Sequence, residues 1–107
     1  MLTELIKLGL SEKEAKVYLA ALELGAQTAQ EIAKKAGVNR ATTYVILQGL
    51  MKKGLASSFT KAKKTYFAAE PPEQLDHLLR KQEEDIFEHR RDLEKMIPEL
   101  RAVFNHA

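Results

Sequence analysis

The predicted fold is decided by residues 28–54, which read TAQEIAKKAGVNRATTYVILQGLMKKG. Thr28 followed by Glu31 makes a capping box that starts a short helix, and Gly37 tolerates the positive φ at which such a helix ends. Asn39 is a favourable N-cap for a second, longer helix that runs to the glycine at the end of the stretch. A short helix, a tight glycine-containing turn and a longer helix are the proportions of a helix-turn-helix.

The second helix of this motif has two faces of different chemistry. Its expected buried side holds residues spaced by three, one and three, namely Thr43, Ile46, Leu47 and Leu50. The opposite side, with the two helix starts, is expected to contact DNA in a major groove about 12 Å wide. These candidate DNA contacts are Thr28, Asn39, Arg40, Ala41, Thr42, Tyr44, Val45, Gln48 and Lys52. Gln48 can bond bidentately to adenine, whereas Val45 suits a thymine methyl or is one tolerated exposed apolar residue.

Residues 55–69, which read LASSFTKAKKTYFAA, are expected to form a β-hairpin directly after the motif. Two short extended runs flank a basic tip that contains Lys61, Lys63 and Lys64. Lysines at that place can neutralise phosphates beside the groove, which holds the register of the protein without reading sequence. A helix-turn-helix followed by a basic hairpin describes a winged domain.

Two further helices are expected before the motif. The first covers residues 3–8 and ends at Gly9. The second begins at Ser11, which forms a capping box with Glu14, and ends at Gly25. Its apolar side supplies core for a small domain.

A long helix with a heptad pattern is expected after the hairpin. Pro71 and Pro72 preset the backbone for a first helical turn, and the pattern continues to about Asn105. Nine residues recur at spacings that alternate between four and three and form one stripe, the heptad seam: Leu75, Leu79, Gln82, Ile86, His89, Leu93, Met96, Leu100 and Val103. A helix of about 50 Å is too long for this domain to cover, so we expect a second copy to pack on the seam and form a homodimer. The alternative is a helix that folds back across its own domain.

Two residues of the long helix need separate comment. Pro98 is expected to kink or restart the helix, because it removes a backbone hydrogen bond. His89 would meet its twin in a parallel pair, where two imidazoles could sense pH or share a metal. A polar seam residue that fixes register together with Gln82 is the favoured interpretation.

Charge divides the chain at about residue 70. The 107 residues carry a formal net charge of +2, made of +5 over residues 1–70 and −3 over residues 71–107. The stretch from Asn39 to Lys64 holds six Lys or Arg and no acidic residue. A local basic block of this kind suits a polyanion or is simply a solvated surface. We expect residues 1–70 to be the winged DNA-binding domain and residues 71–107 the dimerisation helix.

The sequence offers no chemistry for catalysis. No nucleophile lies near a base, no glycine loop cradles a phosphate, and His77, His89 and His106 are too scattered for a metal site. We therefore expect a non-enzymatic protein without cofactor or metal. There is no cysteine, no apolar run long enough to span a bilayer, and no room for a separate ligand domain. These features predict a cytoplasmic protein with no membrane association and no small-molecule effector.

A winged domain can have two functions other than binding double-stranded DNA. A protein-interaction module of transcription or assembly machinery would favour acidic residues on the second helix or the hairpin, and these are absent. An RNA-binding domain would need exposed aromatic residues for stacking. The candidates are Tyr44, Phe59, Tyr66 and Phe67, of which Tyr66 and one phenylalanine are expected in the hairpin core.

Three segments between about Leu8 and Leu75 resemble the TrmB-like group of archaeal and bacterial winged-helix regulators. They read LGLSEKEAKVYLAALELG, TAQEIAKKAGVNRATTYVILQGLMKKGL and KKTYFAAEPPEQL. The resemblance implies a dimeric transcription regulator. In a helix-turn-helix dimer we expect the second helices of the two motifs to enter successive major grooves about 34 Å apart. Longer members carry a C-terminal sugar-binding domain, which has no counterpart here, so a sugar effector is not expected. Thr43 and Val45 stand where the group more often has an apolar residue and a polar or acidic one, which bears on the operator sequence.

Overall fold

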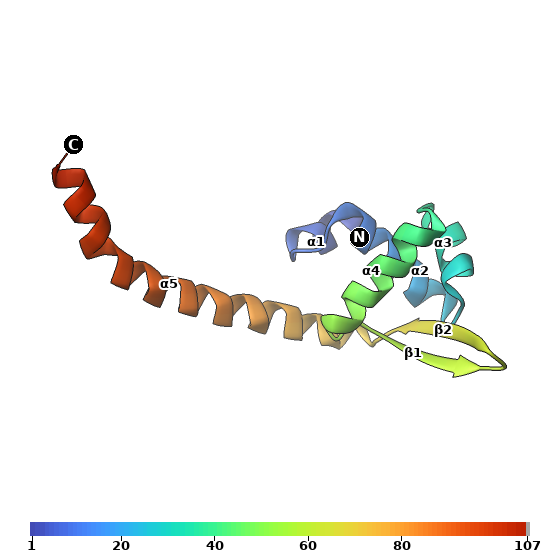
Figure 1. The fold of residues 1–107 in the computed structure, drawn as a ribbon. Coiled ribbons are helices and arrows are strands. Elements are labelled where there is room, and N and C mark those ends of the chain that lie inside the picture. The colour runs from blue at the N-terminus through green and yellow to red at the C-terminus, as the bar shows by residue number, and fades with distance from the viewer. Residues whose placement is uncertain (107) are drawn as a thin grey trace.

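The computed structural model describes residues 1–106 and shows a mainly helical chain with one small sheet. In chain order the elements are α1 (Leu2–Lys7), α2 (Glu12–Leu24), α3 (Ala29–Ala36), α4 (Arg40–Lys52), β1 (Ala56–Lys61), β2 (Lys64–Ala69), the 3-10 turn η1 (Pro72–Gln74) and α5 (Leu75–Asn105). In Figure 1 the first four helices and the hairpin gather at one end, and α5 extends away from them. The molecule measures 65 × 29 × 24 Å. The predicted winged fold with a long C-terminal helix is confirmed.

The helix starts follow the predicted caps, with one difference. Ser11 and Glu14 form a complete capping box, in which each side chain accepts the other residue's backbone N–H at 3.1 and 2.8 Å. At α3 the Thr28 hydroxyl accepts the Glu31 N–H at 3.3 Å, but the Glu31 carboxylate lies beside Lys34 at 3.6 Å. The predicted capping box at Thr28 is therefore wrong in its second half, since the carboxylate pairs with a lysine one turn later.

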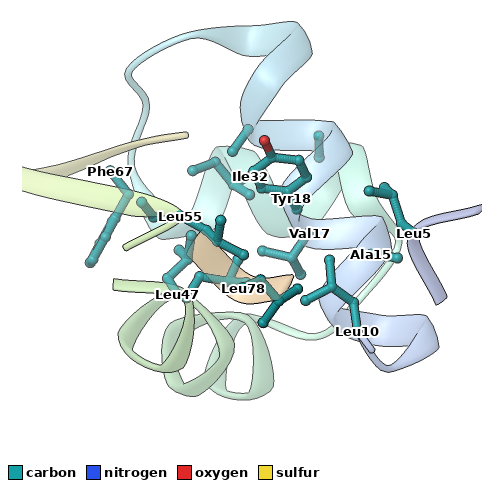
Figure 2. Close-up of a cluster of buried hydrophobic side chains, with 14 residues drawn as sticks. Leu5, Leu10, Ala15, Val17, Tyr18, Ile32, Leu47, Leu55, Phe67 and Leu78 are labelled. Carbon is teal, nitrogen blue, oxygen red and sulfur yellow. The ribbon is translucent and has the colours of Figure 1, made fainter. Parts of the chain in front are cut away.

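The core of the domain forms where α2 meets α3, α4 and the hairpin. Figure 2 shows Val17 and Tyr18 of α2 beside Ile32, Leu47 and other apolar side chains drawn from each of these elements. Each large side chain that leaves water in this way contributes about 1.5–3 kcal/mol. The core thus fixes the angle at which α4 leaves α3.

The turn between α3 and α4 has the predicted geometry. Gly37 is left-handed, at φ 70°, and its N–H donates to the Ala33 carbonyl at 2.9 Å. Ala33 is buried, so its small side chain lets the two helices cross closely. Asn39 then caps α4 by accepting the Thr42 N–H at 2.8 Å.

The hairpin closes with a two-residue turn whose residues are unusual for its backbone geometry. Ala62 and Lys63 both have positive φ, at 51° and 66°, between the cross-strand pair Lys61 and Lys64. Two-residue hairpins prefer such turns because their twist matches that of the strands, although glycine or asparagine is the usual occupant. A backbone bridge between Gln27 and Phe67, with N···O distances of 3.0 and 2.7 Å, ties the hairpin to the start of α3. This pairing holds the hairpin beside the helix-turn-helix of α3 and α4.

Helix α5 packs on the domain only at its beginning. Leu78 is buried, Leu75 packs against the core and Gln82 is half-buried, whereas the helix beyond Gln82 extends into solvent. The helix continues through Pro98, so the predicted restart is wrong. Figure 1 shows α5 curving toward its C-terminal end, which agrees with the predicted bend.

Candidate nucleic-acid interface

The two faces of α4 separate as predicted. Thr43, Leu47 and Leu50 are fully buried, and Ile46 is half-buried. The buried Thr43 hydroxyl donates to the Val38 carbonyl at 3.4 Å, so the polar residue on the inner face has a partner. With its inner face fixed in this way, α4 presents its other face to solvent.

None of the predicted DNA contacts is buried. Thr28, Thr42 and Gln48 are half-buried, and the exposed set comprises Asn39, Arg40, Ala41, Tyr44, Val45, Lys52, Lys61, Lys63 and Lys64. Val45 is 68% exposed, and covering its apolar side chain with a partner would remove that surface from water. An exposed apolar residue on a projecting helix is suited to contact with another molecule.

A cleft of about 990 Å³ runs between the starts of α3 and α4 and the strand β2. Six of the predicted contacts line it together: Thr28, Arg40, Ala41, Tyr44, Lys63 and Lys64. The other predicted contacts lie outside it. Sequence reasoning missed Gln27, Gln30, Thr65 and Tyr66, which also line the cleft. Gln27 could not be found from local patterns, because it pairs through its backbone with Phe67, 40 positions further along the chain.

The cleft favours negative charge. The N-termini of α3 and α4 border it, and each carries the partial positive charge of a helix start. Arg40, Lys63 and Lys64 add full charges, and α4 has no acidic residue in its first turn. Glu31 is the acidic residue of the lining, and Lys34 lies at 3.6 Å from it.

The cations of the candidate interface differ from other cations of the molecule in having no ion-pair partner among the described residues. Within residues 1–106, Arg40, Lys52 and the three hairpin lysines have no carboxylate within 4.0 Å. Lys53, from the same basic block, instead lies 2.8 Å from Glu14. Burial raises the pKa of Glu14, but the bonds from Lys53 and Ser11 outweigh it and lower that pKa below its ordinary value of 4.5. Lys53 therefore stabilises the fold, and the unpaired cations remain available to a ligand.

The aromatic residues take both inner and outer positions. Phe67 is buried and meets Tyr44 edge to face, with ring centres 5.9 Å apart. Phe59 and Tyr66 stack across the strands at 5.5 Å, and Phe59 is 48% exposed. The expectation of Tyr66 in the hairpin core is wrong, because strand alternation puts it on the face opposite Phe67.

The heptad seam of α5 divides into two parts. At its beginning Leu75 packs on the core of its own domain, and the Gln82 amide donates to the Leu8 carbonyl at 2.7 Å. The remaining seam side chains are exposed: Leu79, Ile86, His89, Leu93, Met96, Leu100 and Val103. Ile97 and Phe104 are also exposed and widen the apolar face beside Leu100, which the strict heptad analysis missed. Phe87 is exposed as well, beside Glu83, Glu84 and Glu88. Fold-back of α5 across its own domain is not observed beyond Gln82.

Neither a metal centre nor a membrane span is found among residues 1–106. Their His, Asp and Glu side chains form no group of three that could hold an ion. None of their helices combines the length and the hydropathy needed to cross a bilayer.

A helix-turn-helix, a hairpin beside its second helix and a cationic cleft between them define the chain as a winged-helix protein of the kind found in transcription regulators. The family described as the sugar-specific transcriptional regulator TrmB matches residues 5–73, and the chain belongs to this family. No curated protein matches the sequence.

Several solved structures have a similar fold. TrmBL2, described as an archaeal chromatin protein with a novel mode of DNA binding, is 28% identical with a TM-score of 0.74. The match covers 85% of this chain but 35% of TrmBL2, so the chain spans about a third of that protein. YusO from Bacillus subtilis has 16% identity and a TM-score of 0.59, over 95% of this chain and 77% of its own. MarR from Listeria monocytogenes has 15% identity and a TM-score of 0.55, over 92% and 74%. The last two share the fold alone.

Proposed function

We propose that this protein binds double-stranded DNA as a homodimer and regulates transcription. The observation that carries the proposal is the cleft in which the starts of α3 and α4 meet Arg40, Lys63 and Lys64. Helix N-termini and unpaired cations bind phosphate oxygens, and several such contacts in a row follow a nucleic-acid backbone. Membership of a family of transcriptional regulators supports the same function.

Base recognition is assigned to the exposed face of α4. Ala41 lines the cleft, and the exposed Val45 and the half-buried Gln48 follow about one and two turns further along α4. A backbone bound in the cleft would bring base edges toward this side of the helix. The chemistry of these side chains suits adenine and thymine in the major groove, because an amide pairs with adenine and small apolar groups contact the thymine methyl. The phosphate contacts then hold the register, and α4 supplies the sequence preference.

Homodimerisation is assigned to the free part of α5. From Ile86 to Phe104 the helix exposes an apolar face, and Ile86 itself is 57% exposed. A helix face of this length is covered by a partner in stable proteins, and a second copy offers the same self-complementary surface. Two domains in one dimer bind two half-sites, which raises the overall affinity without new contacts.

The test is binding to a pool of random duplex DNA by the full chain. We compare wild type with Lys63→Ala/Lys64→Ala and with the charge-matched control Lys7→Ala/Lys13→Ala, which alters exposed lysines on α1 and α2. The proposal predicts that the cleft variant loses about tenfold or more in affinity and that the control changes little. Equal losses in both variants, or no duplex binding by a folded wild type, would contradict it and redirect the search to a protein partner.

A further inference from the structure

A polar contact reinforces the joint between the DNA-binding domain and the long helix. Gln82 is half-buried on a helix whose neighbouring residues are exposed, and its amide donates to the Leu8 carbonyl at 2.7 Å. Leu8 is the C-cap of α1, and 74 residues of chain separate the two partners. The bond therefore ties α5 to the turn between α1 and α2.

Gly9 makes the close approach possible. A Cβ at this position would lie 2.5 Å from the Gln82 amide nitrogen, a separation that real Cβ atoms essentially never show. Gly9 also has a φ of +117°, which side-chain-bearing residues rarely adopt. A side chain at position 9 would strain the turn, and the Gln82 amide would have to shift to make room for it.

The joint also fixes the direction in which α5 leaves the domain. Leu75, Leu78 and Gln82 occupy one side of α5 over two turns, and each contacts the domain. Beyond them residues 83–105 continue as one helix of about 35 Å, by the rise per residue. A change of about 10° at the joint would move the far end of that helix by about 6 Å.

We propose that the contact between Gln82 and Leu8, made possible by Gly9, is a positioning joint. In a dimer this joint sets the distance between the α4 helices of the two copies. The inference rests on the proposed DNA-binding dimer. In that dimer the free parts of α5 are paired, so the angle between α5 and its domain determines where each α4 lies. Gln82 then helps to set the half-site spacing through a contact within its own chain. This contact also explains why a polar residue occupies the apolar seam, without any contact to the partner helix.

The first experiment measures the joint in the absence of DNA. The chain has no cysteine, so spin labels on Ser57→Cys and Lys95→Cys report the distance from hairpin to helix. Labelled protein is diluted into unlabelled protein so that only distances within one chain are observed. Gln82→Glu removes the donor without changing side-chain size, and we expect its distance distribution to shift or widen by several ångström. Glu83→Gln, the reverse exchange at the adjacent exposed residue, serves as the control. A distribution in Gln82→Glu identical to wild type would overturn the joint.

The second experiment measures half-site spacing with unlabelled protein. A half-site selected from random duplexes is placed twice in one duplex, and the separation is varied one base pair at a time. Wild type is expected to prefer one spacing roughly tenfold or more, because bivalent binding requires matched geometry. In Gln82→Glu and Gly9→Ala this preference is expected to fall to within a factor of about two, while binding to a single half-site is unchanged. Retained preference in both variants overturns the inference, whereas failure of wild type to bind any half-site overturns the proposed function instead.

Discussion

The cleft and the free part of α5 are both exposed, but they leave different chemistry unsatisfied. Lys63 and Lys64 in the cleft have no carboxylate within 4.0 Å among the described residues. On α5, by contrast, Arg80 pairs with Asp76 at 2.9 Å and Lys81 with Asp85 at 3.2 Å. The part of α5 from Ile86 to Phe104 carries four acidic and four basic residues, so its formal charge balances, and its apolar side chains are left uncovered. The difference indicates a polyanion partner for one surface and an apolar partner for the other.

Breaking the apolar surface should have the largest effect. Leu93→Glu/Leu100→Glu places charges on the exposed seam, so the dimer should dissociate, which light scattering detects as a halved mass. Loss of bivalent contact should lower affinity for a two-half-site duplex by about a hundredfold or more. Arg91→Glu, which changes a charge outside the seam, should remain dimeric. An unchanged mass in the double variant would remove α5 from the dimer interface.

Substitutions on the two faces of α4 sharpen the comparison between surface and core. Leu47 is fully buried, and Leu47→Ala should lower the free energy of unfolding by about 2–5 kcal/mol. Val45→Ala, on the exposed face, should change stability by no more than about 0.5 kcal/mol. Denaturant unfolding of both variants measures the difference. A comparable loss of stability in Val45→Ala would mean that Val45 serves packing and not recognition.

Lys53 provides a smaller and pH-dependent test, because it belongs to the basic block but is paired. Lys53→Met should lower stability at neutral pH by about 1 kcal/mol, since Glu14 loses a partly buried partner. The pKa of Glu14 is lowered in the folded protein, so its contribution is present above the ordinary value of 4.5 and lost as pH falls through the folded value. The stability difference between wild type and variant should therefore shrink on acidification. The DNA affinity of Lys53→Met at neutral pH should fall less than that of Lys63→Ala/Lys64→Ala. An equal loss of affinity would mean that Lys53 also contacts DNA.

Local signals made most of the fold predictable. Ser11, Thr28 and Asn39 each cap a helix through a residue three positions away, and Gly37 ends a helix through its own φ. Such information lies within a few residues, so a sequence contains it directly. The face of α4 was predictable for the same reason, since its periodicity distinguishes Leu47 from Val45.

Contacts between distant segments were not predictable. The bond from Gln82 to Leu8 and the ion pair of Lys53 with Glu14 join residues 74 and 39 positions apart. No periodicity marks such pairs, because they depend on the angles at which whole helices pack. The side of the hairpin that holds Tyr66 was missed for a related reason: alternation shows that Tyr66 and Phe67 face opposite ways but not which of them meets α4.

The most direct test of the central claim is the salt dependence of duplex binding by the wild-type dimer. If the cleft binds phosphates, the logarithm of the association constant falls linearly with the logarithm of salt concentration, with a slope of about −0.9 for each phosphate contacted. We predict a steep slope for wild type. Lys63→Ala/Lys64→Ala should reduce its magnitude by about 0.9 for each phosphate contact removed, which is about 1.8 when both lysines contact phosphates. A flat slope for a folded dimer, or a slope that the substitution leaves unchanged, would contradict the assignment of the cleft to DNA.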